Sequence, residues 1–280
     1  VGKSTLLNAM VGEKVAIVSN KPQTTRNRIM GICTQPGSQI VFLDTPGMHQ
    51  PRTKLGDYMM QTVRESMDGV DALLALVDAT QVGKQDREII TQLSKRKVKK
   101  LLVLNKIDLL KKEALLSLMQ EFSELGYDAI VPVSALTGDG VEELRALIEG
   151  FLPEGPRYFP DDSYTDQPER QICAELIREK ALLHLKDEVP HGIGVEIISL
   201  KEVSPTLTQI DATIYCERDA HKGIIIGRQG AMLKLIGQEA RADIEALLDT
   251  QVNLKLWVKV REGWRDRRDD LRMLGYVKQD

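Results

Sequence analysis

The sequence has few cysteines, no long hydrophobic run and almost no net charge, and each shortage excludes a class of protein. Three of its 280 residues are cysteine, without a C-x-x-C spacing, which argues against a disulfide scaffold and favours a reducing compartment. The longest apolar stretches, such as Ala72–Val77, are far shorter than the ~20 residues that span a bilayer. No signal peptide is visible in a chain that begins at Val1.

The charge balance and composition indicate an ordinary globular protein. Lys and Arg number 38 against 41 Asp and Glu, a net charge of −3, so any nucleic-acid site must be local. A chain that is 42% hydrophobic and 28% charged is not disordered. A length of 280 residues suits two domains.

The first half alternates between short apolar runs and amphipathic stretches. The runs, rich in Val, Ile and Leu, predict buried strands at Ile40–Leu43, Ala72–Val77, Leu101–Leu104 and Ile130–Val133. The amphipathic stretches predict helices near Leu55–Met67, Gln85–Lys95, Lys112–Leu125 and Val141–Phe151. Residues 1–152 are therefore expected to form an α/β domain, a mostly parallel sheet covered by helices.

The second half has a different pattern. Residues 153–168 hold four prolines and four acids and are expected to form a linker. Residues 169–280 predict a smaller α+β domain. Its expected helices are Glu169–Lys186, Ala231–Leu248 and a short charged helix from Trp264, and its expected strands are Gly194–Val203, Thr206–Tyr215, Gly223–Ile226 and Val252–Val260.

A phosphate-binding pattern stands at the start of the chain. Gly2-Lys3-Ser4, followed by a helix from Thr5, is the second half of G-x-x-x-x-G-K-[ST]. Backbone N–H groups at a helix N-terminus attract phosphate oxygens, Lys3 would neutralise the β/γ charge, and Ser4 would ligate Mg²⁺. The first glycine and the strand that feeds the loop would precede Val1, so we expect a chain truncated at its N-terminus and missing its first strand.

A second candidate follows the expected strand Ile40–Leu43. In Asp44-Thr45-Pro46-Gly47, the carboxylate at a strand end can hold Mg²⁺ and the Gly47 N–H can contact the γ-phosphate. The alternative interpretation is an ordinary turn at the end of a strand.

Two further loops point to a guanine base. Asp108 in Asn105-Lys106-Ile107-Asp108 is an acceptor-only carboxylate, which suits the adjacent N1–H and N2–H₂ donors of guanine and selects GTP over ATP. Asn105 would tie the loops together and the Lys106 stem would cover the base. Backbone N–H groups of Ser134-Ala135-Leu136 would reach guanine O6, although a plain strand-to-helix loop is the alternative.

The order of these four motifs carries more weight than any one of them. Each follows an expected strand or opens a helix, and together the chain resembles the translation-factor-related GTPases. Lys21-Pro22-Gln23-Thr24-Thr25-Arg26 looks like switch I of the Era/EngA/MnmE group, which implies that Thr25 or Thr24 closes over Mg²⁺ and γ-phosphate. Without that resemblance the segment reads as a polar surface loop.

The residue that activates water is not identifiable from the sequence. Ras-type GTPases place a Gln after D-x-x-G, whereas Met48 stands here, and a thioether cannot orient water as an amide does. His49 is adjacent, but a lone loop histidine is more often merely exposed. The resemblance implies slow intrinsic hydrolysis.

The second half contains a candidate nucleic-acid clamp, Gly227-Arg228-Gln229-Gly230 before a helix. In a KH domain, G-x-x-G grips about four nucleotides of a single strand, because glycines allow close approach and helix N–H groups complement the phosphates. Lys222 and Ile226 complete the predicted site. Further cations nearby are Lys234 and Arg241.

Residues Lys255–Arg272 form a second basic stretch. Phosphate contact is one interpretation, and a solvated, self-paired helix face is the other, favoured for Arg267–Arg272. Trp257 and Trp264 could stack on bases, but the strand-borne Trp257 is expected in the core.

The order of elements and His221–Gly230 with Trp257–Trp264 resemble the type II KH domain of the Era-type GTPases, and the resemblance covers nearly the whole chain. It implies a GTPase that uses GTP/GDP and Mg²⁺, binds small-subunit ribosomal RNA near its 3′ end and assists assembly of the small ribosomal subunit. It also implies a cytoplasmic monomer with peripheral contact at the inner face of the cell membrane. The alternatives are an RNA-binding module with a vestigial GTPase half and an RNA-modification GTPase.

Overall fold

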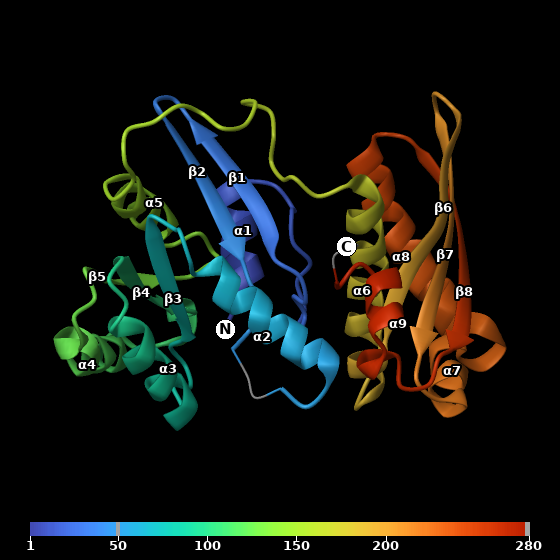
Figure 1. Ribbon diagram of the computed structural model, residues 1–280, viewed down its shortest axis with the longest axis horizontal. Coiled ribbons are helices and arrows are strands. Elements are labelled where there is room, and N and C mark those ends of the chain that lie inside the picture. Colours follow the sequence, from blue (N-terminus) through green and yellow to red (C-terminus); the bar gives the residue numbers. More distant parts are fainter. Residues whose placement is uncertain (49–50, 278–280) are drawn as a thin grey trace. The chain divides into compact units, whose positions relative to one another are not determined.

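The computed structural model describes residues 1–48 and 51–277, which form two compact units (Figure 1). The first unit contains residues 1–16, 28–48 and 63–166, and the second contains residues 17–27, 51–62 and 167–277. The division differs from a simple split at the expected linker, because two segments from the first half of the sequence belong to the second unit.

The first unit is an α/β fold with two small sheets. Strands β1 (Ile29–Gln35) and β2 (Ser38–Asp44) form an antiparallel pair, and β1 was missed in the sequence. The second sheet is parallel, with the order β3 (Ala72–Asp78), β4 (Lys99–Asn105) and β5 (Ala129–Val133). The helices are α1 (Lys3–Val11), α3 (Lys84–Ser94), α4 (Lys112–Phe122) and α5 (Val141–Glu149).

Strand β4 forms the centre of this unit because its apolar side chains are buried on both faces of the sheet. Leu101 and Val103 pack with the core that includes α1 and α5, whereas Leu102 and Leu104 pack with residues of α3 and α4. Alternate residues of a strand point to opposite faces, so a continuous apolar run is required where helices cover both. The predicted parallel sheet is confirmed for β3, β4 and β5, whereas the expected strand Ile40–Leu43 belongs to β2, which pairs antiparallel with β1.

The second unit is an α+β fold around a three-stranded sheet. Its order is β6 (Gly194–Ser204), β7 (Leu207–Cys216) and β8 (Gln251–Val260), antiparallel between β6 and β7 and parallel between β7 and β8. Helices α6 (Glu169–His184) and α8 (Ala231–Leu248) cover one face (Figure 1). The remaining helices are α7 (Asp219–Ile226) and α9 (Arg268–Met273). Helix α2 (Lys54–Ser66) is divided between the units, and its residues 54–62 belong to the second.

Short 3₁₀ turns complete the described residues. They are Ile107–Leu109, Ser123–Leu125, Val189–Gly192, Arg228–Gly230 and Trp264–Asp266. Within residues 1–48 and 51–277, no helix combines the length and apolar content needed to cross a membrane.

The expected strand Gly223–Ile226 was wrong, since these residues end helix α7. Ile225 is fully buried, Ile224 is half exposed and Ile226 packs partly against the core. The run of three β-branched residues favours a strand locally, but burial of one helical face overrides that preference. The helix ends where Gly227 has a φ of 73°, a conformation that glycine adopts readily.

A pair of glycines near α5 offers a test of the first unit. Gly140 has a φ of +74° and a Cβ there would lie 2.3 Å from the carbonyl oxygen of Pro132, whereas Gly138 has a φ of +85° and open space around a Cβ. We expect Gly138→Ala to lower the free energy of unfolding by about 1 kcal/mol through backbone strain. Gly140→Ala should lower it by about 2–4 kcal/mol because backbone must also move.

Urea unfolding of both variants, followed by circular dichroism, measures the difference. Equal destabilisation by the two substitutions would contradict the steric role assigned to Gly140.

Candidate nucleotide-binding site and nucleic-acid groove

The carboxyl ends of the three parallel strands lie level with one another at one edge of the sheet. Asp78 is opposite Asn105, and Asn105 is opposite Val133. Ligands of open α/β sheets bind outside this edge. The loops that follow these strands therefore bring distant parts of the sequence to one place.

Asn105, which is almost fully buried, ties its own loop to the loop after β5 and to the N-terminal residues through its carboxamide. Its Nδ2 donates to the carbonyl of Val1 at 2.9 Å, and its Oδ1 accepts from the amides of Lys106 at 2.8 Å and Ala135 at 2.9 Å. Gly2 has a φ of +92°, and a Cβ there would lie 2.5 Å from Asn105 Nδ2. Only glycine fits beside this carboxamide.

Asp108 is held by a hydroxyl that the sequence had assigned another role. Ser134 Oγ donates to Asp108 Oδ1 at 2.6 Å and accepts from the amide of Thr137 at 3.2 Å. The amide of Ser134 itself donates to the carbonyl of Asp139. With the Ala135 amide bonded to Asn105, both amides are engaged within the loops, and the exposed Leu136 remains the candidate to reach guanine O6.

Four of the residues predicted to bind phosphate and Mg²⁺ lie close to one another in pairs. Ser4 Oγ donates to Asp44 Oδ2 at 2.7 Å, and both residues are buried. Gly47 lies beside Lys3, because a Cβ on Gly47 would be 3.7 Å from Lys3 Nζ. A hydroxyl and a carboxylate are hard oxygen ligands of the kind that Mg²⁺ takes in phosphate sites, so this pair fits the ion. Thr5, Thr45 and Pro46 flank the same residues in the chain.

Asp78 is a residue of this edge that the sequence reasoning missed. The Lys106 ammonium bonds to its carboxylate, while Lys106 has a left-handed backbone with a φ of 69°. Thr80 donates to Asp78 Oδ1 from its hydroxyl at 2.6 Å and its amide at 3.1 Å. Burial acts to raise the pKa of Asp78, but the bonds from Lys106 and Thr80 outweigh it and hold the pKa below its usual value. The sequence signal that could have revealed Asp78 is its place as an acidic residue directly after the apolar run Ala72–Val77.

The predicted switch residues belong to the second unit. Thr24 Oγ1 donates to the carbonyl of Lys21 at 2.7 Å and is hydrogen-bonded to Ser19 Oγ, and Thr25 is buried. Met48 is half-buried and packs against a core cluster of the first unit that includes Val77. His49 lies outside the described residues.

A groove runs beside the predicted clamp of the second unit. It measures about 460 Å³ and lies between α8 and β8. Gly227 is required at its position, because a Cβ there would lie 2.7 Å from Met232 Cβ. Arg228 and Gln229 are exposed, while Lys222 and Ile226 are half-buried. The groove is lined by Gly230, Leu233, Lys234, Gly237, Gln238, Arg241, Leu254 and Leu256.

Several of these lining residues escaped the sequence analysis. In the sequence these residues, Leu233, Gly237 and Leu256, look like ordinary core residues of a helix and a strand. The groove forms only where α8 packs beside β8.

Two arginines of the second basic stretch are paired with acids of the same unit. Arg261 bonds to the buried Asp270 at 2.6 Å, and Arg265 bonds to Glu217 at 2.5 Å. The placement of the tryptophans corrects the expectation. Trp264 is fully buried, whereas Trp257 has 61% of its surface exposed, because its position on β8 points away from the helices.

Comparisons with known proteins match both halves of the chain. A family model described as 50S ribosome-binding GTPase matches residues 1–106, and a KH domain model matches residues 188–265. GTPase Era of Ruminiclostridium cellulolyticum is 53% identical over 278 residues, covering 99% of this chain and 93% of the relative. GTPase Era of Clostridioides difficile is 50% identical over 280 residues, covering 99% and 94%.

Two solved structures are similar over nearly the whole chain. One is Era in complex with MgGDPNP and nucleotides 1506–1542 of 16S ribosomal RNA, with a TM-score of 0.95, 40% identity and coverage of 99% of this chain and 95% of that chain. The other is a variant of Aquifex aeolicus Era bound to GDP·AlF4⁻, with a TM-score of 0.94, 40% identity and the same coverage.

The Asp108 carboxylate offers a test of base recognition. In Asp108→Asn, an N–H faces guanine donors where a carboxylate accepted two bonds, so GDP affinity should fall by about 10- to 100-fold. Xanthosine diphosphate should bind the variant better than GDP does, because it presents a carbonyl in place of the exocyclic amine. Isothermal titration measures both.

Asp139→Asn is the matched control, an exposed acid in the neighbouring loop. Unchanged GDP binding by Asp108→Asn, or an equal loss in the control, would remove Asp108 from the base site.

Proposed function

Because the chain belongs to the Era family of GTPases, we propose that it binds and hydrolyses GTP and uses the nucleotide to control its grip on small-subunit ribosomal RNA. The RNA is bound near its 3′ end by the KH domain, and the complex assists assembly of the small ribosomal subunit. The relatives named GTPase Era and the Era structure with a 16S ribosomal RNA fragment support this proposal.

The first unit supplies the nucleotide site. Lys3 neutralises the β/γ-phosphates, the Gly47 amide contacts the γ-phosphate, and Asp108 with Lys106 holds the base. Ser4 and Asp44 would hold Mg²⁺ together with Thr25 or Thr24 of switch I. When bound, the ion neutralises charge on the phosphate oxygens.

Hydrolysis is expected to be slow. Met48 packs against a core cluster and has no group that can orient water, so this chain lacks the glutamine of Ras-type enzymes at that position. GTP yields GDP and phosphate, and the residue that activates water is not assigned.

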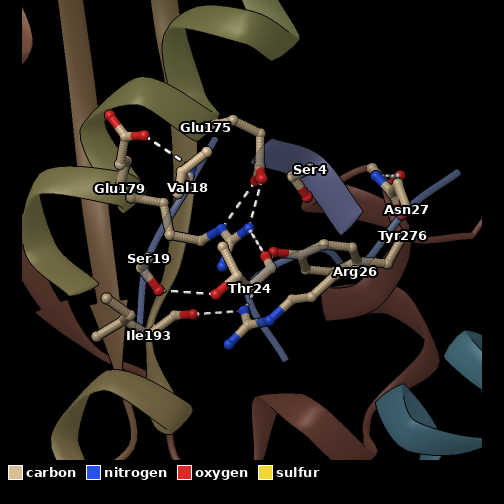
Figure 2. Close-up of polar contacts among 12 residues, drawn as sticks. Ser4, Val18, Ser19, Thr24, Arg26, Asn27, Glu175, Glu179, Ile193 and Tyr276 are labelled. Atoms are coloured by element: carbon tan, nitrogen blue, oxygen red, sulfur yellow. Dashed lines mark hydrogen bonds and ion pairs between the residues drawn. The ribbon is translucent and has the colours of Figure 1, made fainter. Parts of the chain in front are cut away.

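The observation that carries the proposal is that residues 17–27, with the Thr-Thr-Arg of switch I, are built into the second unit together with the KH fold. Figure 2 shows Arg26 reaching Ile193 and Tyr276. One guanidinium nitrogen donates to the carbonyl of Ile193 at 2.7 Å and to Tyr276 Oη at 3.2 Å, and the other donates to the carbonyl of His191 at 3.2 Å. The guanidinium carbon lies 5.7 Å from the centre of the Trp264 ring.

Helix α6 holds the same segment from another side. The buried guanidinium of Arg178 bonds to the backbone carbonyl of Thr24 and to the Glu175 carboxylate. Glu179 Oε1 accepts from the amide of Val18 at 2.8 Å. A change at Thr24 therefore acts directly on a buried charge of the KH unit.

The start of α2, which follows D-x-x-G, is also part of the second unit. Leu55 and Met59 are buried with Trp264. The amide of Lys54 donates to Asp266 Oδ1 at 2.9 Å, and the Tyr58 hydroxyl donates to Asn27 Oδ1 at 3.1 Å. Both candidate switch segments thus share partners in this unit.

These contacts suggest how nucleotide and RNA are coupled. In GTPases the γ-phosphate and its Mg²⁺ order the switch loops, which are released on hydrolysis. Residues 20–29 and 44–64 are the segments that would change here. Their release would break the bonds of Arg26 and Arg178 and thereby expose or hide the G-x-x-G groove.

The proposal also includes the compartment and the oligomeric state of the protein. We place the protein in the cytoplasm as a monomer that meets the small ribosomal subunit. Peripheral contact with the inner face of the cell membrane is proposed on the family resemblance alone.

The clamp can be tested by charge reversal. Arg228→Asp with Gln229→Asp places two carboxylates where phosphates should lie, so affinity for RNA of nucleotides 1506–1542 should fall at least about tenfold while GDP affinity stays constant. Lys111→Asp with Lys112→Asp is the control, an exposed pair at the start of α4. Equal loss in the control would mean non-specific electrostatic binding.

The coupling can be tested at Arg26. In Arg26→Lys the ammonium cannot reproduce the fork that bonds two carbonyls, so RNA affinity measured with GDPNP and with GDP should converge. The exposed Arg28→Lys should leave the wild-type difference intact. A wild-type protein with equal RNA affinity in both nucleotide states would support the vestigial alternative, and a full difference in Arg26→Lys would refute the assigned role.

A further inference from the structure

Trp257 is the feature of the second unit that the proposed function leaves unexplained. It is one of two tryptophans in the sequence, and 61% of its surface is exposed. An indole is large and mostly apolar, so exposing it forgoes much of the stabilisation that burial would give. Trp264, by contrast, is fully buried and donates its Nε1–H to the carbonyl of Gly192 at 2.9 Å.

The alternation of β8 places Trp257 on the sheet face opposite α6 and α8. Val252, Leu254, Leu256, Val258 and Val260 of this strand pack into or against the core. Asn253, Lys255, Trp257 and Lys259 are the exposed residues in between. One face of the strand therefore carries an aromatic ring with a lysine two residues away on each side.

The cations of this face are available and its acids are engaged. Among the described residues, neither Lys255 nor Lys259 has a carboxylate within ion-pair distance. Glu196 accepts a bond from the Tyr215 hydroxyl at 2.8 Å, and Asp211 accepts one from Ser199 Oγ at 2.9 Å. These hydrogen bonds leave both carboxylates charged, and Asp211 stands opposite Lys255 in the strand register. Lys255 and Lys259 are the charged residues that flank Trp257 along the strand.

Strand β8 also forms part of the KH groove. Leu254 and Leu256 line the groove, and Lys255 and Trp257, their neighbours in the chain, point to the opposite face. In the sheet order β6-β7-β8, β8 is an edge strand. A strand of nucleic acid that leaves the groove has only to pass this edge to meet Trp257.

We propose that the open face of β8, formed by Lys255, Trp257 and Lys259, is a second RNA subsite that stacks an unpaired base. The two lysines would contact the flanking phosphates. The proposal rests on the proposed function, because the RNA that occupies this subsite continues from the strand held at Gly227–Gly230.

The chemistry favours single-stranded RNA over other occupants. Proteins that hold single strands pair aromatic rings, on which bases stack, with cations along the backbone. A protein partner that buried Trp257 would need more apolar surface around it, whereas lysines stand on both sides. A KH groove grips about four nucleotides, so a longer RNA requires contacts beyond it.

The test compares two lengths of RNA on the full chain. One probe is a single strand of about six nucleotides, enough to fill the groove, and the other is RNA of nucleotides 1506–1542. Trp257→Ala should weaken binding of the long RNA by about tenfold or more and leave the short one unchanged. Trp257→Phe should retain most of the affinity, and Trp257→Leu, which keeps an apolar side chain without a π face, should not.

Two further readouts separate stacking from a structural effect. The long RNA should quench the fluorescence of Trp257 in the wild type, and Trp257→Phe, which retains only the buried Trp264, should show little quenching. Lys255→Ala with Lys259→Ala should reduce the dependence of long-RNA affinity on salt concentration. Val203→Ala, an exposed apolar residue of β6, is the control and should change nothing.

The outcomes are distinguishable. Wild-type affinity of Trp257→Ala for the long RNA, or full affinity of Trp257→Leu, overturns the subsite. Equal weakening of both RNAs would also overturn it, since that indicates damage to the groove. If the wild-type chain binds neither RNA, the proposed KH function fails, and that failure is seen without any variant.

Discussion

The second unit depends on the buried guanidinium of Arg26, whose two terminal nitrogens are hydrogen-bonded while its Nε has no partner among the described residues. Burial lowers the pKa of Arg26 from its usual value, because a charged group loses its hydration there, and the neighbouring cation of Arg178 adds to the effect, while the Tyr276 hydroxyl opposes it. The charge is retained by carbonyl oxygens and by two aromatic faces. Removing the partners of a buried charge is strongly destabilising, so the segment that carries Arg26 and the KH residues that receive it must keep their arrangement or change it together.

The first unit is organised by a neutral group where the second uses charges. The Asn105 carboxamide ties its own loop to the loop after β5 and to the N-terminal residues, and none of these bonds requires a buried ion. Such a site is preorganised, because its loops hold one another before any ligand arrives. The contrast has a physical consequence, because breaking a neutral amide bond costs less than removing the partners of the buried charges of Arg26 and Arg178.

Local sequence pattern predicts an element well where its pattern of buried residues and its intrinsic helix or strand propensity favour the same structure. Helix Ala231–Leu248 was predicted with its bounds, and the parallel strands were placed within a few residues, because apolar period and turn residues agree there. The strand predicted at Gly223–Ile226 was wrong, because three consecutive isoleucines favour a strand whereas burial of one helical face decides the structure. Strand β1 was missed because Ile29–Gln35 mixes Gly31, Cys33 and polar residues, and its partner β2 supplies the pairing. Trp257 was expected in the core because its neighbours are apolar, yet strand alternation gave it the open face.

The same argument explains which site residues the sequence revealed. Motifs for phosphate and base are local, since each lies in one loop at the end of one strand, and the chemistry of Ser4, Asp44 or Asp108 can be read from a few neighbouring letters. The role of Arg26 cannot, because its partners stand 167 and 250 positions away and its own segment reads as a polar loop. The role of the Ser134 hydroxyl and the place of Asp78 were missed for the same reason, because their partners Asp108 and Lys106 come from other loops. The motifs of the nucleotide site can thus be read from short stretches of sequence, whereas the contacts that build residues 17–27 into the second unit are long-range contacts to buried charges.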